Sequence, residues 1–447
     1  MEIDIRNKDG WFFQDQDKSI VHEITTIGIN ELLALAQEED CWVDYIRCLV
    51  HEREKAISDG SWWSRPESSF FKEECLFLNT EGTVHSFPYG KRIITFPIRR
   101  HLFRGENQMF PTSVPSLNRM LSKIEDETEK ELYRAVSYLR KNEFGNLIWQ
   151  IDVVPYWEAK ISDINYDALA QHYGFETHLL DLTNDIRIAL FFATCKYDPV
   201  THTYAPLTHQ DITKNENTQY GFIYHAPDWI VDYMNGGGGL RWGEQHLPRT
   251  KEEIKDIHFN LQSGDMDGVA MQIGYQPLYR CHCQSGYIFP MRNETPLQTS
   301  PYFEIIRFKQ SEALSKAIYK LMKNGETVFP DEGITEINDI LLQLQNTTTF
   351  SNSALEEVYH FDGIDKTIFP SFDSLKDSIN GFKTSNGKIT INDNVNVPSI
   401  PSEKLKRINN YYNNRDLLAP IGGKIYQRPE DKKYRENCCK MIYGYLF

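Results

Sequence analysis

Apolar positions in the first part of the chain recur at helical spacing. Ile29, Leu32, Leu33 and Ala36 are separated by three or four residues, which predicts a helix over about residues 30–39. A second helix is predicted over about residues 43–57, and a turn-rich stretch with Trp62, Trp63 and Pro66 follows it. Residues 1–90 are therefore predicted to form a mainly helical N-terminal region.

The middle of the chain alternates between strand and helix patterns. Lys91 to Phe103, Tyr220 to His225 and Ile305 to Phe308 are rich in β-branched and aromatic residues, and each predicts a strand. Residues 123–141 predict an exposed, charged helix. These patterns predict an α+β fold with a central, mostly antiparallel sheet and surrounding helices.

After the last of these strands, a helix is predicted from Ser311, as its N-cap, to Asn324, and Gly325 ends it. One face of this helix is apolar at i, i+3, i+4, i+7 and i+8, so that face is predicted to be core. A further helix is predicted from the isoleucines and leucines between Ile334 and Leu344.

A C-terminal extension, residues 346–447, completes the predicted organisation. Residues 370–404 are rich in Ser, Asn, Asp and Lys, which predicts an irregular connection or surface segment. The aromatic end, Tyr443 to Phe447, is predicted to pack onto the body of the protein, because free tails rarely carry so much apolar area.

The composition is that of a globular protein, with 40% hydrophobic and 13% aromatic residues over a chain of 447 residues. No apolar run approaches the roughly 20 residues that a membrane-spanning helix needs. The first residues lack the basic and apolar segments of a signal peptide, so a soluble, cytoplasmic protein is expected. A net charge of −15 works against long-range attraction of nucleic acid or anionic membranes.

Local basic and glycine-rich runs each leave two interpretations open. Lys91-Arg92 and Arg99-Arg100-His101 suit either a solvated strand edge or attraction of a phosphate-bearing ligand. Gly236 to Gly239 lacks the spacing of a phosphate-binding loop, which favours a mobile loop. A lid that brings Leu240-Arg241-Trp242 over a nearby site is the alternative.

The eight cysteines do not predict a disulfide framework in a chain of this length. Cys281-His282-Cys283 has no second ligand pair nearby with the spacing typical of structural zinc sites. Buried thiols are predicted, and no metal site is.

Three short motifs stand in order along the middle of the chain. They are F-R-G at Phe103–Gly105, P-S-L-N-R at Pro115–Arg119, and Q-H-Y-G-F-E-T-H-L-L-D-L-T from Gln171, which runs into an apolar helix ending near Ala193. Together they resemble the FRG domain family, with Leu182 where the family more often has an aromatic residue and Ile186 where it usually has proline. R-C-H-C-Q-S-G from Arg280 and V-F-P-D from Val328 resemble its closing elements. The FRG domain is accordingly predicted over residues 91–345.

This resemblance implies an arrangement similar to an ADP-ribosyltransferase-like fold. In such a fold a first-strand Arg contacts NAD, a strand with Ser or Thr leads into a helix, and a later strand supplies Glu or Gln. Arg104, Thr183 and Gln284 correspond to these places. The resemblance implies an ADP-ribosyltransferase or NAD glycohydrolase, with NAD as substrate, acting as a bacterial toxin or phage-defence effector. Gln284 stands where a transferase usually has Glu.

Each candidate side chain suits part of that chemistry. A guanidinium at Arg104 can bind pyrophosphate oxygens bidentately, and Gly105 lets a ligand approach the backbone. The Thr183 hydroxyl could hold Arg104 or contact the nicotinamide ribose. Gln284 could bind a ribose hydroxyl but cannot act as a general base. Asp181 is the candidate base or stabiliser of the oxocarbenium ion.

Arg119, His172 and Tyr173 complete the predicted NAD-binding set. Structural roles are the alternatives: a buried Arg104–Asp181 ion pair, a helix cap at Thr183 or Asn184, core packing of His172 and Tyr173, and a sheet position for Gln284.

Two other functions remain open. One is a module that binds NAD, ADP-ribose or a nucleotide without turnover, which the glutamine at position 284 favours. The other is a sensing or scaffold domain whose residues 1–90 and 350–447 contact a partner protein. The acceptor of a transferred group is not identified by any motif.

Overall fold

The structure of the protein is a computed structural model. The described residues are 102–160, 164–198, 203–226, 271–273, 276–284, 286–291, 296–300, 303–393, 395 and 398–414, together with the backbone of six short strands within residues 1–101.

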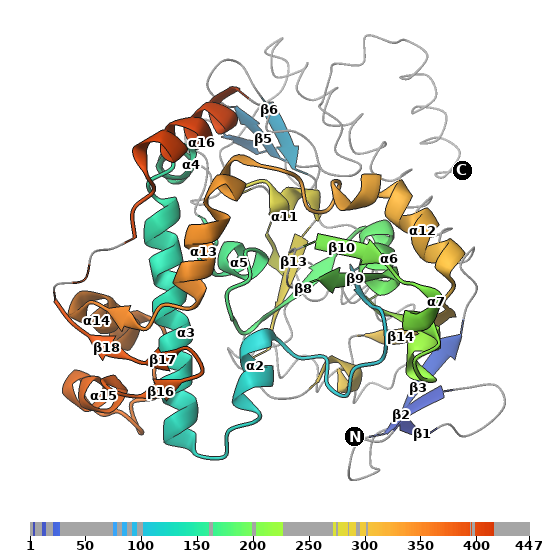
Figure 1. Ribbon diagram of the computed structural model, residues 1–447, viewed down its shortest axis with the longest axis horizontal. Helices are drawn as coiled ribbons and strands as arrows, with labels where there is room; N and C mark the ends of the chain where they lie inside the picture. The colour runs from blue at the N-terminus through green and yellow to red at the C-terminus, as the bar shows by residue number, and fades with distance from the viewer. Residues whose placement is uncertain are drawn as a thin grey trace.

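A nine-stranded sheet forms the centre of the fold (Figure 1). Its order is β1-β2-β3-β14-β11-β7-β8-β13-β12, and every neighbouring pair is antiparallel except β3 with β14. The prediction of an α+β fold around a mostly antiparallel sheet is confirmed. The strands are β1 (Ile3–Asp4), β2 (Trp11–Gln14), β3 (Val21–Thr26), β7 (Leu102–Glu106), β8 (Leu179–Thr183), β11 (Tyr220–Ala226), β12 (Met271–Gln272), β13 (Gly286–Pro290) and β14 (Glu304–Lys309).

Alternate residues of the central strands feed two separate cores, as the two-residue period of a strand requires. On one face Leu102, Phe222 and Tyr224 join a cluster of buried side chains. On the other face Phe103 and Ile223 pack against two helices, α6 (Ile186–Thr194) and α12 (Glu312–Leu321), which lie together there (Figure 1).

Gly105 is the point where α6 comes closest to the sheet. A Cβ atom on this residue would lie 1.8 Å from the carbonyl oxygen of Ala189 and 3.0 Å from the amide nitrogen of Ala193. Both are backbone atoms of α6 and cannot rotate away. The glycine of the F-R-G motif is thus required by helix–strand packing, whereas the sequence suggested a ligand as the reason for it.

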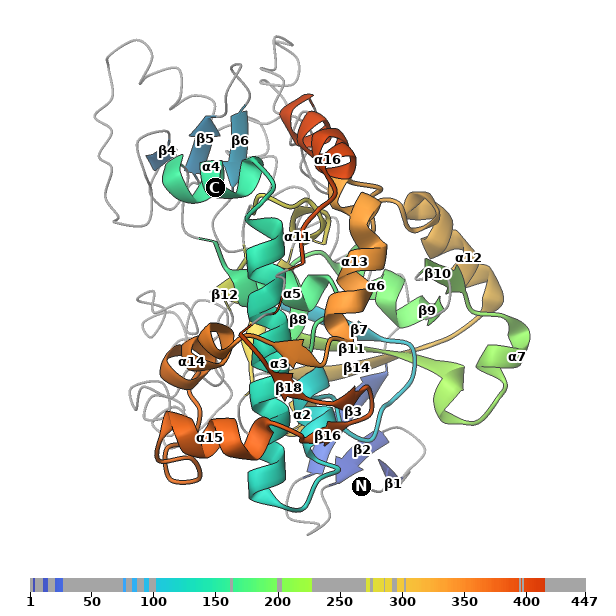
Figure 2. The ribbon, with the colours of Figure 1, turned by 60° about the vertical axis from the view of Figure 1, so that its left-hand side comes forward.

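A long helix, α3 (Glu127–Ile148), runs along the side of the sheet (Figures 1 and 2). The prediction of an exposed helix is wrong in part, because Lys141 and Glu143 are buried and Phe144, Leu147 and Ile148 are fully buried. Asp126 caps the helix by accepting a hydrogen bond from the amide of Glu129. The core beside its C-terminal half is completed by α4 (Val153–Lys160), α5 (Tyr166–His172), the 3₁₀ helix η6 (Gly333–Ile337), α13 (Asn338–Gln345) and α16 (Ser402–Asn414).

The opposite half of α3 carries a small C-terminal layer (Figures 1 and 2). Leu375 and Ile379 are buried here at i, i+4 spacing, which is why a segment predicted to be irregular contains a helix. The layer consists of α14 (Asn352–Phe361), α15 (Phe372–Ile379), β15 (Thr349–Phe350), β18 (Thr390–Ile391) and the hairpin of β16 (Lys383–Thr384) with β17 (Gly387–Lys388).

The buried carboxylate of Glu332 fastens α16 to the rest of the fold. It accepts hydrogen bonds from the Tyr173 hydroxyl, from the Tyr279 amide at 2.8 Å and from the Tyr412 hydroxyl at 2.9 Å. Burial, and then the charge of Glu332, raise the pKa of Tyr173 and of Tyr412 well above the ordinary value. Three donors satisfy this carboxylate, so its burial is compatible with a stable fold.

The predicted start of α12 and two predicted strands are confirmed, whereas Leu321 on the predicted core face of α12 is 54% exposed. Ser311 caps α12 through the amide of Leu314, and Gly325 has a φ of +93° just beyond the helix. The strands predicted at Tyr220 to His225 and Ile305 to Phe308 correspond to β11 and β14.

The N-terminal predictions are tested less completely. The described residues of 1–90 form strands. β1 to β3 lie in the central sheet, and β5 (Thr83–Ser86) pairs with β4 (Cys75–Phe77) on one side and β6 (Arg92–Thr95) on the other. The stretch predicted as one strand, Lys91 to Phe103, contains β6 and the start of β7. The predicted helices near residues 30–39 and 43–57, the run Gly236 to Gly239, and the end Tyr443 to Phe447 lie outside the described residues.

Among the helices described here, none has both the length and the apolar character needed to cross a membrane.

Replacement of Gly105 by alanine is expected to lower the free energy of unfolding by about 3 kcal/mol or more, because overpacking against backbone atoms cannot relax. Gly145→Ala in α3 is the matched control. Its added Cβ would have a nearest contact of 3.5 Å, so the helix should gain stability by up to about 1 kcal/mol. Urea denaturation of both variants measures this, and equal effects would refute the packing role of Gly105.

Stability is expected to fall as pH rises above about 10, the ordinary tyrosine pKa. The folded state retains the Tyr173 and Tyr412 protons where the unfolded state loses them, so each group lowers the unfolding free energy by up to about 1.4 kcal/mol per pH unit there. Tyr412→Phe should make this decline shallower in denaturation curves recorded from pH 8 upward. If stability falls equally steeply with pH in the variant and the wild type, the contribution of the Tyr412–Glu332 hydrogen bond is contradicted.

Candidate functional site

The two strands that carry the predicted site separate from one another at one end. Described pairing between β7 and β8 consists of Phe103 opposite Thr183, while β7 continues along β11 and β8 along β13. A cavity of about 270 Å³ lies at this separation, and we call it the β7–β8 cleft. Its lining residues are Phe103, Arg104, Gly105, Glu106, Asn107, Phe110, Asp181, Leu182, Thr183, Phe192, Cys195, Tyr197, Tyr204 and Gln284.

Arg104 spans the cleft from β7 to β8. Its Nη1 donates a hydrogen bond to the backbone oxygen of Asp181 at 2.9 Å, and its Nε donates to Oε1 of Glu106 at 3.1 Å. Glu106 is buried, and its other oxygen accepts from the Ser113 hydroxyl at 2.8 Å. The alternative of an Arg104–Asp181 ion pair is wrong, because the carboxylate that pairs with Arg104 is that of Glu106. Among the described residues Arg104 has no acceptor for Nη2, so that donor is available to a ligand.

Asp181 presents a carboxylate to the cleft, and its side chain is 37% exposed. Its Oδ2 accepts a hydrogen bond from Gln171 Nε2 at 3.3 Å. Gln171 in turn accepts from the Thr177 hydroxyl at 2.5 Å. The Q-H-Y-G-x-x-T-x-x-x-D pattern is therefore a chain of hydrogen bonds that orients the carboxylate. Oδ1 is buried and lacks a hydrogen-bond partner among the described residues.

His172 and Tyr173 lie behind the cleft and are not part of its lining. His172 Nδ1 lies 3.0 Å from the carbonyl oxygen of Ala168 and 3.7 Å from Asp181 Oδ1. The Arg280 guanidinium lies over the Tyr173 ring at 4.5 Å and donates to the His172 carbonyl oxygen at 2.7 Å. Both residues are buried and help position α5, in agreement with the structural alternative for them.

Thr183 and Gln284 join the end of β8 to the start of β13. The Thr183 hydroxyl donates to the Gln284 carbonyl oxygen at 2.8 Å and accepts from the amide of Asp185 at 3.1 Å. The cap of α6 is Asp185, and not Thr183 or Asn184, because its carboxylate accepts from the Arg187 amide. Both predicted residues line the cleft, but the Thr183 hydroxyl is already engaged with the fold.

Gln284 lies in the turn after the short helix α11 (Arg280–Cys283), two residues before β13, so the sheet position considered for it is not observed. Its Nε2 donates to the Val328 carbonyl oxygen at 3.3 Å. The amide is thereby held in a structural contact, although the residue still borders the cavity.

The last predicted residue, Arg119, is exposed on α2 (Ser116–Leu121). Its Nη2 donates to the carbonyl oxygen of Val114 at 3.3 Å, and it does not line the cleft. The structure thus brings together Arg104, Gly105, Asp181, Thr183 and Gln284 of the predicted set.

An aromatic wall is the feature of the cleft that sequence reasoning missed. Tyr197 on β9 (Cys195–Asp198) and Tyr204 on β10 (Thr203–Pro206) are opposite one another in a hairpin, with ring centroids 5.2 Å apart. Tyr197 is 47% exposed and Phe110 38% exposed. Burial raises the pKa of Tyr204. No helical or strand periodicity relates Phe192, Tyr197 and Tyr204 in the sequence. They form one surface only because the β9–β10 hairpin brings them together.

Cys195 also borders the cleft, and burial raises the pKa of its thiol to about 12. A thiol with so high a pKa remains protonated at neutral pH and is a poor nucleophile. Cys281 and Cys283 are likewise buried, and burial raises the pKa of Cys281. Within the described part of the chain, no three His, Cys, Asp or Glu side chains are grouped as ligands for a metal ion.

Comparison with known protein families gives a match to part of the chain. Residues 99–201 match the profile of the FRG domain family. This segment contains Arg104, Gly105, Asp181, Thr183 and the Tyr197 part of the wall, and it is shorter than the 91–345 predicted from the motifs. Neither the curated proteins nor the solved structures contain a match to this chain.

The Cys195 thiol is expected to resist iodoacetamide at pH 7 in the folded protein, because both burial and its raised pKa suppress the thiolate. Mass spectrometry of the peptide that contains Cys195 measures the modification, with the guanidinium-unfolded chain as the positive control. Rapid modification of the folded chain would show that this side of the cleft opens to solvent.

Proposed function

Because residues 99–201 form an FRG domain, we propose that the β7–β8 cleft binds NAD and supports transfer of its ADP-ribosyl group. The observation that carries this proposal is the position of Arg104, whose guanidinium is fixed at two atoms and still offers Nη2 to the cavity. A fixed guanidinium fork suits the oxygens of a pyrophosphate, since little side-chain freedom is lost when the ligand binds.

The size and walls of the cleft agree with binding of the nicotinamide half. A cavity of about 270 Å³ is at the lower end of the range for ligand sites, so the adenosine half extends beyond it. Phe110 and Tyr197 offer exposed ring faces at this cavity, and a planar pyridinium ring stacks favourably on aromatic rings.

The reaction separates charge in a way that the cleft can accommodate. The bond between the ribose C1′ and the nicotinamide nitrogen breaks, and its electron pair leaves with nicotinamide. Positive charge develops on the ribose until a nucleophile bonds to C1′ and releases a proton. Glu106 and Asp181 both line the cleft, but Glu106 pairs with Arg104, so the partly exposed carboxylate of Asp181 is the one that can stabilise that charge.

A second candidate is binding of NAD or a related nucleotide without turnover. It is favoured by Gln284, whose side chain is engaged with Val328 and carries no charge. In this case the cleft would recognise the ligand and signal its presence to a partner protein. A toxin or phage-defence effector is the biological setting that we associate with NAD consumption.

Removal of the Arg104 guanidinium is expected to abolish nicotinamide release from NAD, measured by proton NMR with cellular RNA, DNA and lysate as acceptors. Arg104→Ala alone leaves Glu106 buried and unpaired, which costs about 3–5 kcal/mol of stability. The double variant Arg104→Met/Glu106→Gln removes the pair without an orphaned charge, so it should fold and still be inactive. Release at the wild-type rate by this folded variant would refute the role of Arg104.

The Asp181→Asn variant distinguishes a cleft that catalyses NAD turnover from one that only binds NAD. The amide retains an acceptor for Gln171, so the fold and the NAD-dependent rise in melting temperature should persist, while turnover falls by about 10²–10³. Asp373→Asn, on the exposed surface of α15, is the matched control and should leave turnover unchanged. A rise in melting temperature without nicotinamide release from the wild type would establish the binding module instead.

A further inference from the structure

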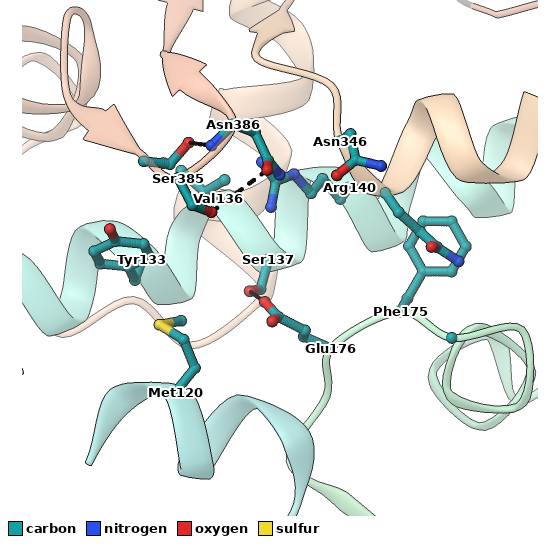
Figure 3. A pocket seen from close by; sticks show the side chains of 13 residues that line it. Met120, Tyr133, Val136, Ser137, Arg140, Phe175, Glu176, Asn346, Ser385 and Asn386 are labelled. Atoms are coloured by element: carbon teal, nitrogen blue, oxygen red, sulfur yellow. Dashed lines mark hydrogen bonds between the residues drawn. The ribbon is translucent and has the colours of Figure 1, made fainter. Parts of the chain in front are cut away.

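A second cavity is bordered by the turn that follows α5 (Figure 3). Its volume is about 300 Å³, and it is enclosed by α3, by that turn, by the end of α13 and by the tip of the β16–β17 hairpin. The residues that carry the following argument are Tyr133, Ser137, Arg140, Glu176, Ser385 and Asn386. None of them belongs to the β7–β8 cleft.

Arg140 is the chemically unusual residue of this cavity. Its Nε donates a hydrogen bond to the Thr347 carbonyl oxygen at 3.2 Å. Its Nη2 is buried and has no acceptor among the described residues. Burial also lowers the pKa of Arg140, against the opposing effect of Glu176. An unsatisfied guanidinium donor in a cavity destabilises the fold, and a ligand oxygen that accepts from it would offset this cost.

Glu176 supplies the complementary group. Its Oε2 accepts from the Ser137 hydroxyl at 3.2 Å, and both side chains point toward the space below Asn386 and Arg140 in Figure 3. A cavity that contains one guanidinium and one carboxylate suits a ligand with an anionic group next to hydroxyl donors. Acidic side chains commonly bind ribose hydroxyls in this way.

Apolar side chains complete the enclosure. Tyr133 and Met120 lie on one side of the cavity and Phe175 on the other (Figure 3). The hairpin tip, Ser385-Asn386, is exposed at the opening. The volume is near the lower limit of ligand sites and suits a mononucleotide better than a larger molecule.

We propose that this cavity binds a sugar phosphate of mononucleotide size, with its phosphate on Arg140 and a sugar hydroxyl on Glu176. The shared chemistry is the phosphate monoester of a ribose, which occurs both in a free sugar phosphate and in a nucleoside monophosphate. This site is separate from the cleft, and the inference does not depend on the function proposed for the cleft.

Isothermal titration calorimetry of the full chain tests the proposal with AMP, ribose 5-phosphate and inorganic phosphate. AMP and ribose 5-phosphate should bind saturably, and inorganic phosphate at least tenfold more weakly. AMP tighter than ribose 5-phosphate identifies a nucleotide that packs its base on Tyr133, whereas equal affinities identify the sugar phosphate. The absence of binding by both, or inorganic phosphate as tight as AMP, overturns the proposal.

Two variants locate the binding. Arg140→Gln should weaken it at least tenfold, because charge-assisted hydrogen bonds are lost. Asn386→Tyr, at an exposed hairpin tip, should block the opening while leaving Arg140 and the melting temperature unchanged. The control is Arg104→Met/Glu106→Gln, which alters only the other cavity and should retain full binding. Binding that survives both cavity variants, or that is lost in the control, refutes the assignment to this site.

Discussion

The close contact between α6 and β7 fixes the arrangement of the central strands. At Gly105 the helix backbone occupies the space of a side chain, so the strand and the helix meet backbone to backbone. Because only two residues separate the end of β8 from the start of α6, this contact also fixes where β8 lies relative to β7. The separation of the two strands, and with it the cleft, follows from the packing of one helix.

Around this contact, polar groups are arranged so that few charges are left unpaired. Glu106 is buried beside Arg104 and also accepts from Ser113, while Asp181 is held by Gln171. Such networks orient side chains because each alternative rotamer would leave a buried group unsatisfied. The same polar contacts that hold the two strands therefore hold a guanidinium and a carboxylate at one cavity. This is the preorganisation expected of a site for a charged ligand.

The short segment between α5 and β8 borders the second cavity and is hydrogen-bonded to a residue that contacts Asp181 in the cleft. Gly174 and Glu176 border the second cavity, and Thr177 bonds to Gln171, which in turn holds Asp181 in the cleft. Gly174 has a φ of +88°, a conformation that glycine adopts without strain, and the Gln345 side chain binds the carbonyl oxygen of Tyr173 beside it. The segment that borders the second cavity thus also contributes a hydrogen bond to the side chain that orients Asp181 in the cleft.

The elements with strong local patterns could be predicted from the amino-acid sequence. Helix α12 with its Ser311 cap, strands β11 and β14, and the α+β class follow from periodicity and capping, which act over a few neighbouring residues. The resemblance to the FRG family also predicted that Arg104, Asp181 and Thr183 share a site, and the three residues line one cavity. Such motifs show which residue types recur together, but not which atoms they contact.

The hydrogen-bond and packing partners of those residues could not be predicted from the sequence and depend on the tertiary fold. The pairing of Arg104 with Glu106 instead of Asp181, the distance of Arg119 from the cleft, and the aromatic wall of Tyr197 and Tyr204 depend on how distant segments pack. The helix α15 in a segment with a polar composition depends on burial against α3, which no local pattern reports. Side chains that meet across a sheet or between layers are set by long-range packing, and a single sequence carries no direct record of it.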